Sequence, residues 1–142
     1  MKQQNLSNHS RYVPGFHIVL LGLLVAGFAA SFINLRNLTE AENLAAKLLC
    51  LVFVCMILTA YYARAFALKA QDRAIRAEEK LRYFTLTGKL PAHNLTLSQY
   101  TALRFAPDEE FVQLADKAAT ECLAPKQIKR QISNWKGDFE RV

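Results

Sequence analysis

Residues 44–62, LAAKLLCLVFVCMILTAYY, decide the fold of this chain. The stretch has 19 residues and one formal charge, at Lys47. This length of apolar sequence matches a helix that crosses the hydrocarbon core of a bilayer. Residues 64–82 are rich in charge but contain no glycine or proline, so the helix should continue through them. We predict one helix that spans a membrane at 44–63 and extends as a cytoplasmic stalk over 64–87.

A second apolar run precedes this helix, at 16–36, and carries its only formal charge on its last residue. A cleaved signal peptide is the alternative interpretation, because the small residues at 27–31 resemble a cleavage site. Apolar residues continue past that point, which favours a membrane span. Residues 37–43 form a short extracytoplasmic link, with capping-box spacing between Thr39 and Glu42. The sequence therefore predicts an all-α protein built on an integral membrane hairpin of two transmembrane helices.

The distribution of charge predicts the orientation of the hairpin. The net charge of +6 arises from residues 1–15, which carry +2, and residues 64–89, which carry +4, while the other segments balance. Because Lys and Arg concentrate in cytoplasmic loops, we expect both termini in the cytoplasm. The N-terminal segment 1–15 is expected to be flexible. A basic excess beside the apolar runs favours anionic lipid over nucleic acid as a partner.

Residues at the cytoplasmic ends of the two spans are predicted to lie at the membrane interface. Paired tyrosines are typical of an aromatic belt, and basic side chains can reach lipid head groups. The histidine of this set is interpreted as an interfacial residue bonded to a tyrosine or a head group. The alternative is a proton relay or a contact to haem or quinone, as in a small redox or transport accessory subunit. The predicted interface residues are His17, Tyr61, Tyr62, Arg64, Lys69 and Arg73.

Small residues at four-residue spacing predict where the two spans pack together. Such residues allow the backbones of membrane helices to approach closely, although glycine and alanine are also common in these helices without such a role. We call the predicted set the hairpin seam. It consists of Gly22, Ala26 and Ala30 in the first span, and Cys55, Thr59 and Ala63 in the second.

The stalk carries a narrow apolar stripe with spacings of three and four residues, close to a coiled-coil seam. We expect it to pack against the C-terminal region or against a second copy of the stalk, the alternative being a solvated helix whose alanines favour helicity. Favourable ion pairs are expected from Asp72 to Arg76 and from Glu78 to Arg82, and Gly88 is expected to end the helix. We call the stripe the stalk face: Phe66, Ala70, Ala74, Ala77, Leu81 and Phe84.

Three short helices are predicted after the stalk. A capping box begins at Thr96, Pro107 precedes an acidic first turn, and Pro125 suits the first position of a helix. Together they form a small cytoplasmic helical subdomain at 95–135, followed by a polar tail at 136–142. The predicted helices are 97–105, 107–122 and 126–134.

Several motifs in combination resemble a family of small bacterial membrane proteins, a domain of unknown function. The resemblance covers nearly the whole chain from Tyr12 onward. It implies a protein of a bacterial inner membrane with two membrane spans and a cytoplasmic C-terminal region, and it implies no activity or catalytic residues. The motifs are Tyr12-x-Pro14-Gly15-Phe16-His17, Gln71-Asp72-Arg73, Leu103-Arg104-Phe105-Ala106 and Ile128-Lys129-x-x-Ile132-x-Asn134-Trp135.

No residue pattern predicts an enzyme, a cofactor or a metal site. The three acidic residues at 108–110 suit the positive end of a helix dipole, and the three cysteines have no disulfide or metal-ligand spacing. A membrane-tethered nucleic-acid binder would use the basic helix around Lys129, but residues 90–142 have no net charge. We predict a non-enzymatic membrane anchor, scaffold or accessory subunit, whose partners are the lipid bilayer and either another membrane-complex subunit or a second copy.

Overall fold

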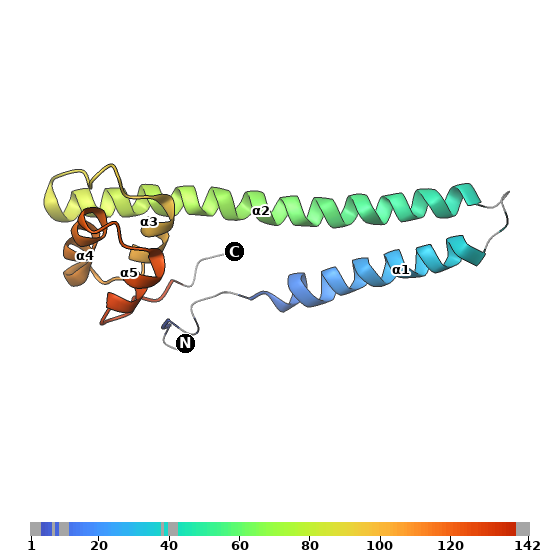
Figure 1. The fold of residues 1–142 in the computed structure, drawn as a ribbon, viewed down its shortest axis with the longest axis horizontal. Helices are drawn as coiled ribbons and strands as arrows, with labels where there is room; N and C mark the ends of the chain where they lie inside the picture. The colour runs from blue at the N-terminus through green and yellow to red at the C-terminus, as the bar shows by residue number, and fades with distance from the viewer. Residues whose placement is uncertain (1–3, 7, 9–11, 38, 40–42, 139–142) are drawn as a thin grey trace. The chain divides into compact units, whose positions relative to one another are not determined.

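The computed structural model describes residues 4–6, 8, 12–37, 39 and 43–138. Throughout these residues the regular structure is helical and no strand is present, which confirms the all-α prediction. The elements in chain order are η1 (Gly15–Leu20, a π-helical segment), α1 (Leu21–Asn37), α2 (Asn43–Thr87), α3 (Leu97–Leu103), α4 (Asp108–Thr120) and α5 (Pro125–Gln131) (Figure 1). The predicted capping partner Glu42 lies outside the described residues.

Contacts divide the chain into two compact units. Tyr12–Phe66 form one unit, which we call the hairpin, and Ala67–Val142 form the other together with Met1–Arg11. Helix α2 contributes residues to both. Two helical stretches, Gly15–Asn37 and Asn43–Thr87, are long and apolar enough to cross a membrane.

Within the hairpin, the two helices lie antiparallel (Figure 1). The Phe53 ring occupies the space beside Gly27, and the Arg64 guanidinium lies 5.9 Å from the centre of the Phe16 ring. Residues 16 and 27 are as far apart along one helix as residues 53 and 64 along the other, so both contacts have the same register. The most protected residues recur every three or four positions, as in a coiled coil. They are Leu24, Gly27, Phe28, Ser31 and Leu35 in α1, and Ala46, Cys50, Phe53, Ile57, Ala60 and Arg64 in α2.

The residues predicted as the hairpin seam do not make this contact. All six are exposed in the hairpin, and a Cβ atom on Gly22 would have no neighbour within 4 Å. At 100° per residue, Ala26 lies about 200° from Leu24, on the far side of its helix. The prediction recognised that a small residue is needed but chose the wrong stripe, because the glycine that accommodates a neighbouring ring is Gly27. The contact between the two helices is therefore made by the protected residues above, and not by the predicted set Gly22, Ala26, Ala30, Cys55, Thr59 and Ala63.

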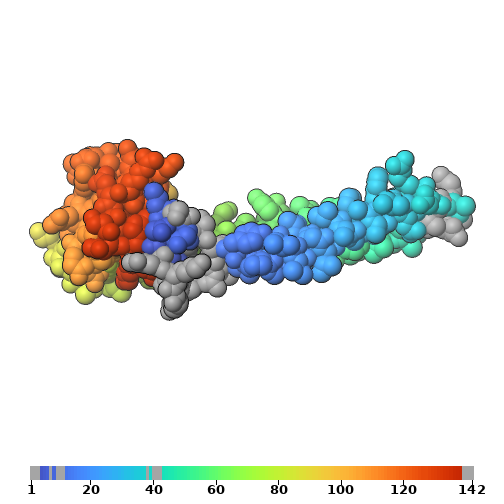
Figure 2. All heavy atoms as spheres, turned by 90° about the horizontal axis from the view of Figure 1, so that it is seen from below, coloured from blue at the N-terminus to red at the C-terminus, as the bar shows by residue number. Residues whose placement is uncertain are grey.

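The second unit contains a helical head, residues 95–138, built on one face of α2. Helices α3, α4 and α5 pack against each other, and Figure 2 shows their orange to red atoms as one closely packed group. Three residues of α2, Ile75, Glu79 and Tyr83, are buried on this face. The largest fully buried side chains in the core are Tyr100, Leu103, Phe105, Phe111 and Ile128.

The ends of the head helices follow local sequence signals. Gly88 has a φ of 71° and its N–H donates to the Phe84 carbonyl at 2.7 Å, so α2 ends as a C-terminal glycine predicts. The capping box at Thr96 and the proline at the start of α5 are both present. Helix α4 stops at Thr120, two residues early, because Cys122 adopts a left-handed φ of 51°.

Candidate functional site: the Arg82 cluster and the cleft between α4 and α5

Arg82 is the centre of a charged cluster where the last turns of α2 meet the start of α4. Its Nε donates to Asp108 Oδ1 at 2.6 Å, and its Nη1 donates to Glu79 Oε2 at 3.1 Å. Its Nη2 donates to the Ala106 carbonyl at 2.8 Å. The guanidinium also lies 4.3 Å from the centre of the Phe111 ring. The Arg82 side chain of α2 is therefore held by three residues at the start of α4: Ala106, Asp108 and Phe111.

The cluster is largely removed from water. The Arg82 and Glu79 side chains are 14% and 10% exposed, whereas that of Asp108 is 58% exposed. Burial raises the pKa of the Glu79 carboxyl above its usual value, and the neighbouring Arg82 charge opposes this shift. A buried charge is costly unless it is paired, so Glu79 and Arg82 depend on each other.

A second polar contact joins α2 to α4. The Tyr83 hydroxyl donates to Asp116 Oδ1 at 2.6 Å, and the Tyr83 ring packs edge-on against Phe111. The hydrogen bond to the Asp116 carboxylate raises the pKa of Tyr83 to about 12, with burial as a further cause. The phenol therefore stays protonated and acts as a hydrogen-bond donor at neutral pH.

Sequence reasoning found part of this cluster. It paired Arg82 with Glu78, four residues before, but the structure pairs it with Glu79, three residues before. The reason lies in the fold: Asp108 and the Ala106 carbonyl attract the guanidinium to the face of α2 that bears Glu79. The capping role of the acidic residues at 108–110 was predicted, whereas the tertiary partner of Asp108 had no local signal.

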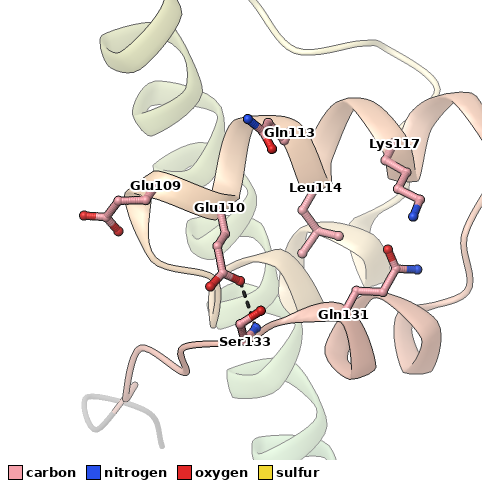
Figure 3. Close-up of a pocket in the computed structure, with 7 residues that line it drawn as sticks. All are labelled: Glu109, Glu110, Gln113, Leu114, Lys117, Gln131 and Ser133. Carbon is pink, nitrogen blue, oxygen red and sulfur yellow. Dashed lines mark hydrogen bonds between the residues drawn. The ribbon is translucent and has the colours of Figure 1, made fainter.

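A cleft of about 260 Å³ lies between α4 and the end of α5 (Figure 3). Glu110 forms one wall, where its carboxylate accepts the Ser133 N–H at 2.9 Å and the Asn134 N–H at 3.1 Å. These bonds replace a further helical turn, which is why α5 ends at Gln131 rather than at residue 134. The lining residues are Glu109, Glu110, Gln113, Leu114, Lys117, Gln131 and Ser133.

The cleft and the cluster hold no recognisable catalytic arrangement. Glu110 is engaged with backbone N–H groups, and the Arg82 donors are engaged with protein acceptors. Among the residues that the structure describes, no group of three His, Cys, Asp or Glu side chains could hold a metal ion. The contacts described above join the helices of the head to α2 and to one another.

The predicted membrane-interface residues are found in two places. In the hairpin, His17 Nδ1 lies 2.9 Å from the Val13 carbonyl oxygen and its ring stacks on Tyr12 at 4.6 Å. These contacts are made by residues just before η1, whereas Tyr61 and Tyr62 are both exposed. Lys69 and Arg73 belong to the second unit and are exposed on α2.

The stalk face is exposed along its whole length. In the part of the stalk face that shares a unit with the head, from Ala70 to Phe84, the described head residues pack on a different face of α2, through Ile75, Glu79 and Tyr83. The described residues of the C-terminal region, the first expected partner, therefore do not cover this part of the stalk face. Cys122, just beyond the end of α4, is exposed. The other two cysteines, Cys50 and Cys55, are unpaired thiols in α2, five residues apart.

Comparisons with known proteins place the whole chain in one family. Curated proteins and solved structures gave no match. A family model described as "Family of unknown function (DUF6526)" matches residues 1–142. This agrees with the resemblance to a domain of unknown function that the motifs indicate. The chain therefore belongs to the family of unknown function DUF6526.

Proposed function

We propose that this protein is a non-enzymatic anchor and scaffold of a bacterial inner membrane, which presents a cytoplasmic helical head on the extension of its second membrane span. The observation that carries the proposal is that α2 belongs to both units of the chain. Its first half contributes to an apolar hairpin, and its last turns supply Ile75, Glu79 and Tyr83 to the head. A helix shared in this way would tie the head directly to the membrane.

The exposed surface of the hairpin supports the membrane assignment. Only 11% of the most apolar window of Gly15–Asn37 is buried, and only 6% of that of Asn43–Thr87. Large apolar side chains such as Ile33, Leu44 and Leu51 are more than half exposed. An apolar surface of this extent is unfavourable in water, whereas lipid would cover it, and helices satisfy their own backbone groups in lipid.

Contacts within the second unit support a hairpin that returns to its starting side. The Gln4 Nε2 donates to the Asp138 carbonyl at 3.0 Å, and the Asp138 N–H donates to Gln4 Oε1 at 2.9 Å. Figure 2 shows the described part of the N-terminal segment (blue) against the red C-terminal atoms. This contact supports both ends lying on one side of the membrane, and the basic residues near the spans favour the cytoplasmic side.

The scaffold role rests on how the head uses its charges. Glu79, Arg82 and Asp116 are bound to other groups of the protein, and they join α2 to α4. Such a network holds the head in a defined conformation, as a binding surface requires. In a catalytic centre, some of these charged groups would instead face a substrate. Anionic lipid near Lys69 and Arg73 and a protein subunit are the partners that we propose.

Two measurements test this proposal. Alkaline extraction should leave the full chain in the membrane pellet, since the hairpin would be integral to the bilayer. Affinity purification in mild detergent, read by mass spectrometry, should recover either a second copy or another membrane subunit in stoichiometric amount. Release at alkaline pH would contradict the anchor, and a strictly monomeric protein with no partner would contradict the scaffold.

A further inference from the structure

The part of the stalk face within the second unit is an apolar strip without a cover in the described structure. Leu81 is 66% exposed and Phe84 is 49% exposed. Ala70, Ala74 and Ala77 continue the strip along α2 and are exposed as well. The spacing is four, three, four and three residues, which is that of the a and d positions of a coiled coil.

This strip lies opposite the head. At 100° per residue, Glu79 is about 200° from Ala77 and about 200° from Leu81 in the other direction, so it lies behind the strip. Glu79 is buried against the head, as are Ile75 and Tyr83. A helix could therefore pack on the strip without displacing any contact between α2 and the head.

We propose that the strip binds the same strip of a second copy of this chain, with the two α2 helices parallel and in register. The proposal rests on the proposed membrane anchor, because two copies inserted with one topology present their stalks in the same direction. A heptad places Ala70, Ala77 and Phe84 at d, and Ala74 and Leu81 at a. Alanine at three of these five positions permits close approach of the two helices.

Charges beside the strip are complementary for this arrangement. Arg73 is at a g position, and Glu78, five residues later, is at an e position, so each Arg73 would lie beside the Glu78 of the other copy. Symmetry repeats this pair. Both residues are exposed, and neither forms an ion pair among the residues that the structure describes. Lys80, the next g position, would face Thr85, which carries no charge.

The same charges disfavour an antiparallel pair. In antiparallel coiled coils, g positions of one helix face g positions of the other. That arrangement would bring Arg73 and Lys80 of one copy towards Lys80 and Arg73 of the other, and like charges would repel. The pairing of Arg73 with Glu78 of the other copy thus favours a second copy as the partner and a parallel arrangement of the two α2 helices.

Disulfide cross-linking in native membranes tests the contact. In the full chain with Cys50, Cys55 and Cys122 replaced by alanine, Ala77→Cys would place two thiols near the symmetry axis. Oxidation should convert it to a covalent dimer. Leu86→Cys is the matched control, since Leu86 is also exposed on α2 but lies about 200° from Phe84, and it should remain monomeric.

A charge exchange tests the register in the same Ala77→Cys background. Arg73→Glu would place two carboxylates side by side at each pair, and most of the cross-linked dimer should be lost. Adding Glu78→Arg should restore it. Equal cross-linking at residues 77 and 86, no cross-linking at 77, or failure of the exchange to restore the dimer would each overturn the proposal. Alkaline extraction of the same variants shows separately whether the anchor itself holds.

Discussion

Gly27 lies directly against the ring of Phe53: a Cβ atom at Gly27 would overlap both Cε1 and Cζ of that ring. Non-bonded carbon atoms do not approach so closely, so the absence of a side chain at Gly27 allows α1 and α2 to meet at this level. The contact of Phe16 with Arg64 repeats the same register. The hairpin is therefore positioned by one glycine and one aromatic ring.

The first prediction concerns this glycine. Gly27→Ala should destabilise the hairpin by about 1–3 kcal/mol, because the Phe53 ring must move to make room. Gly22→Ala is the matched control: its Cβ would meet nothing within 4 Å, and alanine is favoured over glycine in a helix. Thermal unfolding in detergent, followed by circular dichroism, measures both. Equal effects of the two variants would contradict the assigned contact.

The second prediction concerns the buried ion pair. Arg82→Met should lower the free energy of unfolding by about 3–5 kcal/mol, because it leaves the Glu79 charge buried without its partner. Further replacement by Glu79→Met should recover part of this loss, since the only charge then left without Arg82 is Asp108, which is 58% exposed. Arg130→Met, at an exposed arginine of α5, is the control and should change stability by less than about 0.5 kcal/mol. A double variant no more stable than Arg82→Met would argue against the pair.

The pKa of Glu79 yields a prediction about pH. Burial raises this pKa above its ordinary value of 4.5, so the folded protein binds the proton more tightly than the unfolded chain does. The contribution of Glu79 to stability must then fall as the pH rises from 4.5 through the raised folded pKa. Glu79→Gln cannot titrate. The melting temperature of the wild type, measured relative to this variant, should therefore decrease between pH 4 and pH 7. A relative increase would show that the Arg82 charge outweighs burial.

Tyr83 supplies a fourth prediction. Tyr83→Phe removes the hydrogen bond to Asp116 and should cost about 1.5–3 kcal/mol, the range for bonds to charged groups. Tyr61→Phe, at an exposed ring, should be nearly neutral. An ultraviolet titration should also show one phenol that ionises at about pH 12 and that is absent from the Tyr83→Phe variant. If the phenol missing from the Tyr83→Phe titration has an ordinary pKa instead, the result would contradict the hydrogen bond between Tyr83 and Asp116.

Local signals in the sequence were enough to predict the helices, but they were not enough to predict which residues of those helices contact each other. Glycine at residue 88 and the capping box at Thr96 are read directly from residue types, because a cap depends on neighbours along the chain. The choice of Gly27 over Gly22 depends on where Phe53 lies across the hairpin. The partner of Arg82 depends on Asp108, which is 26 residues away. Both need the three-dimensional fold, which the spacing of small or charged residues does not determine.

The central claim is that α2 crosses a membrane and continues into a cytoplasmic head, and cysteine labelling in intact spheroplasts tests it most directly. The variants carry Thr39→Cys or Leu90→Cys in the chain without native cysteines, and Leu90 is 76% exposed. A maleimide that cannot cross the membrane should label residue 39 in intact spheroplasts, and it should label residue 90 only after the membrane is opened. Labelling of residue 90 from outside, or of both residues equally before opening, would contradict the account.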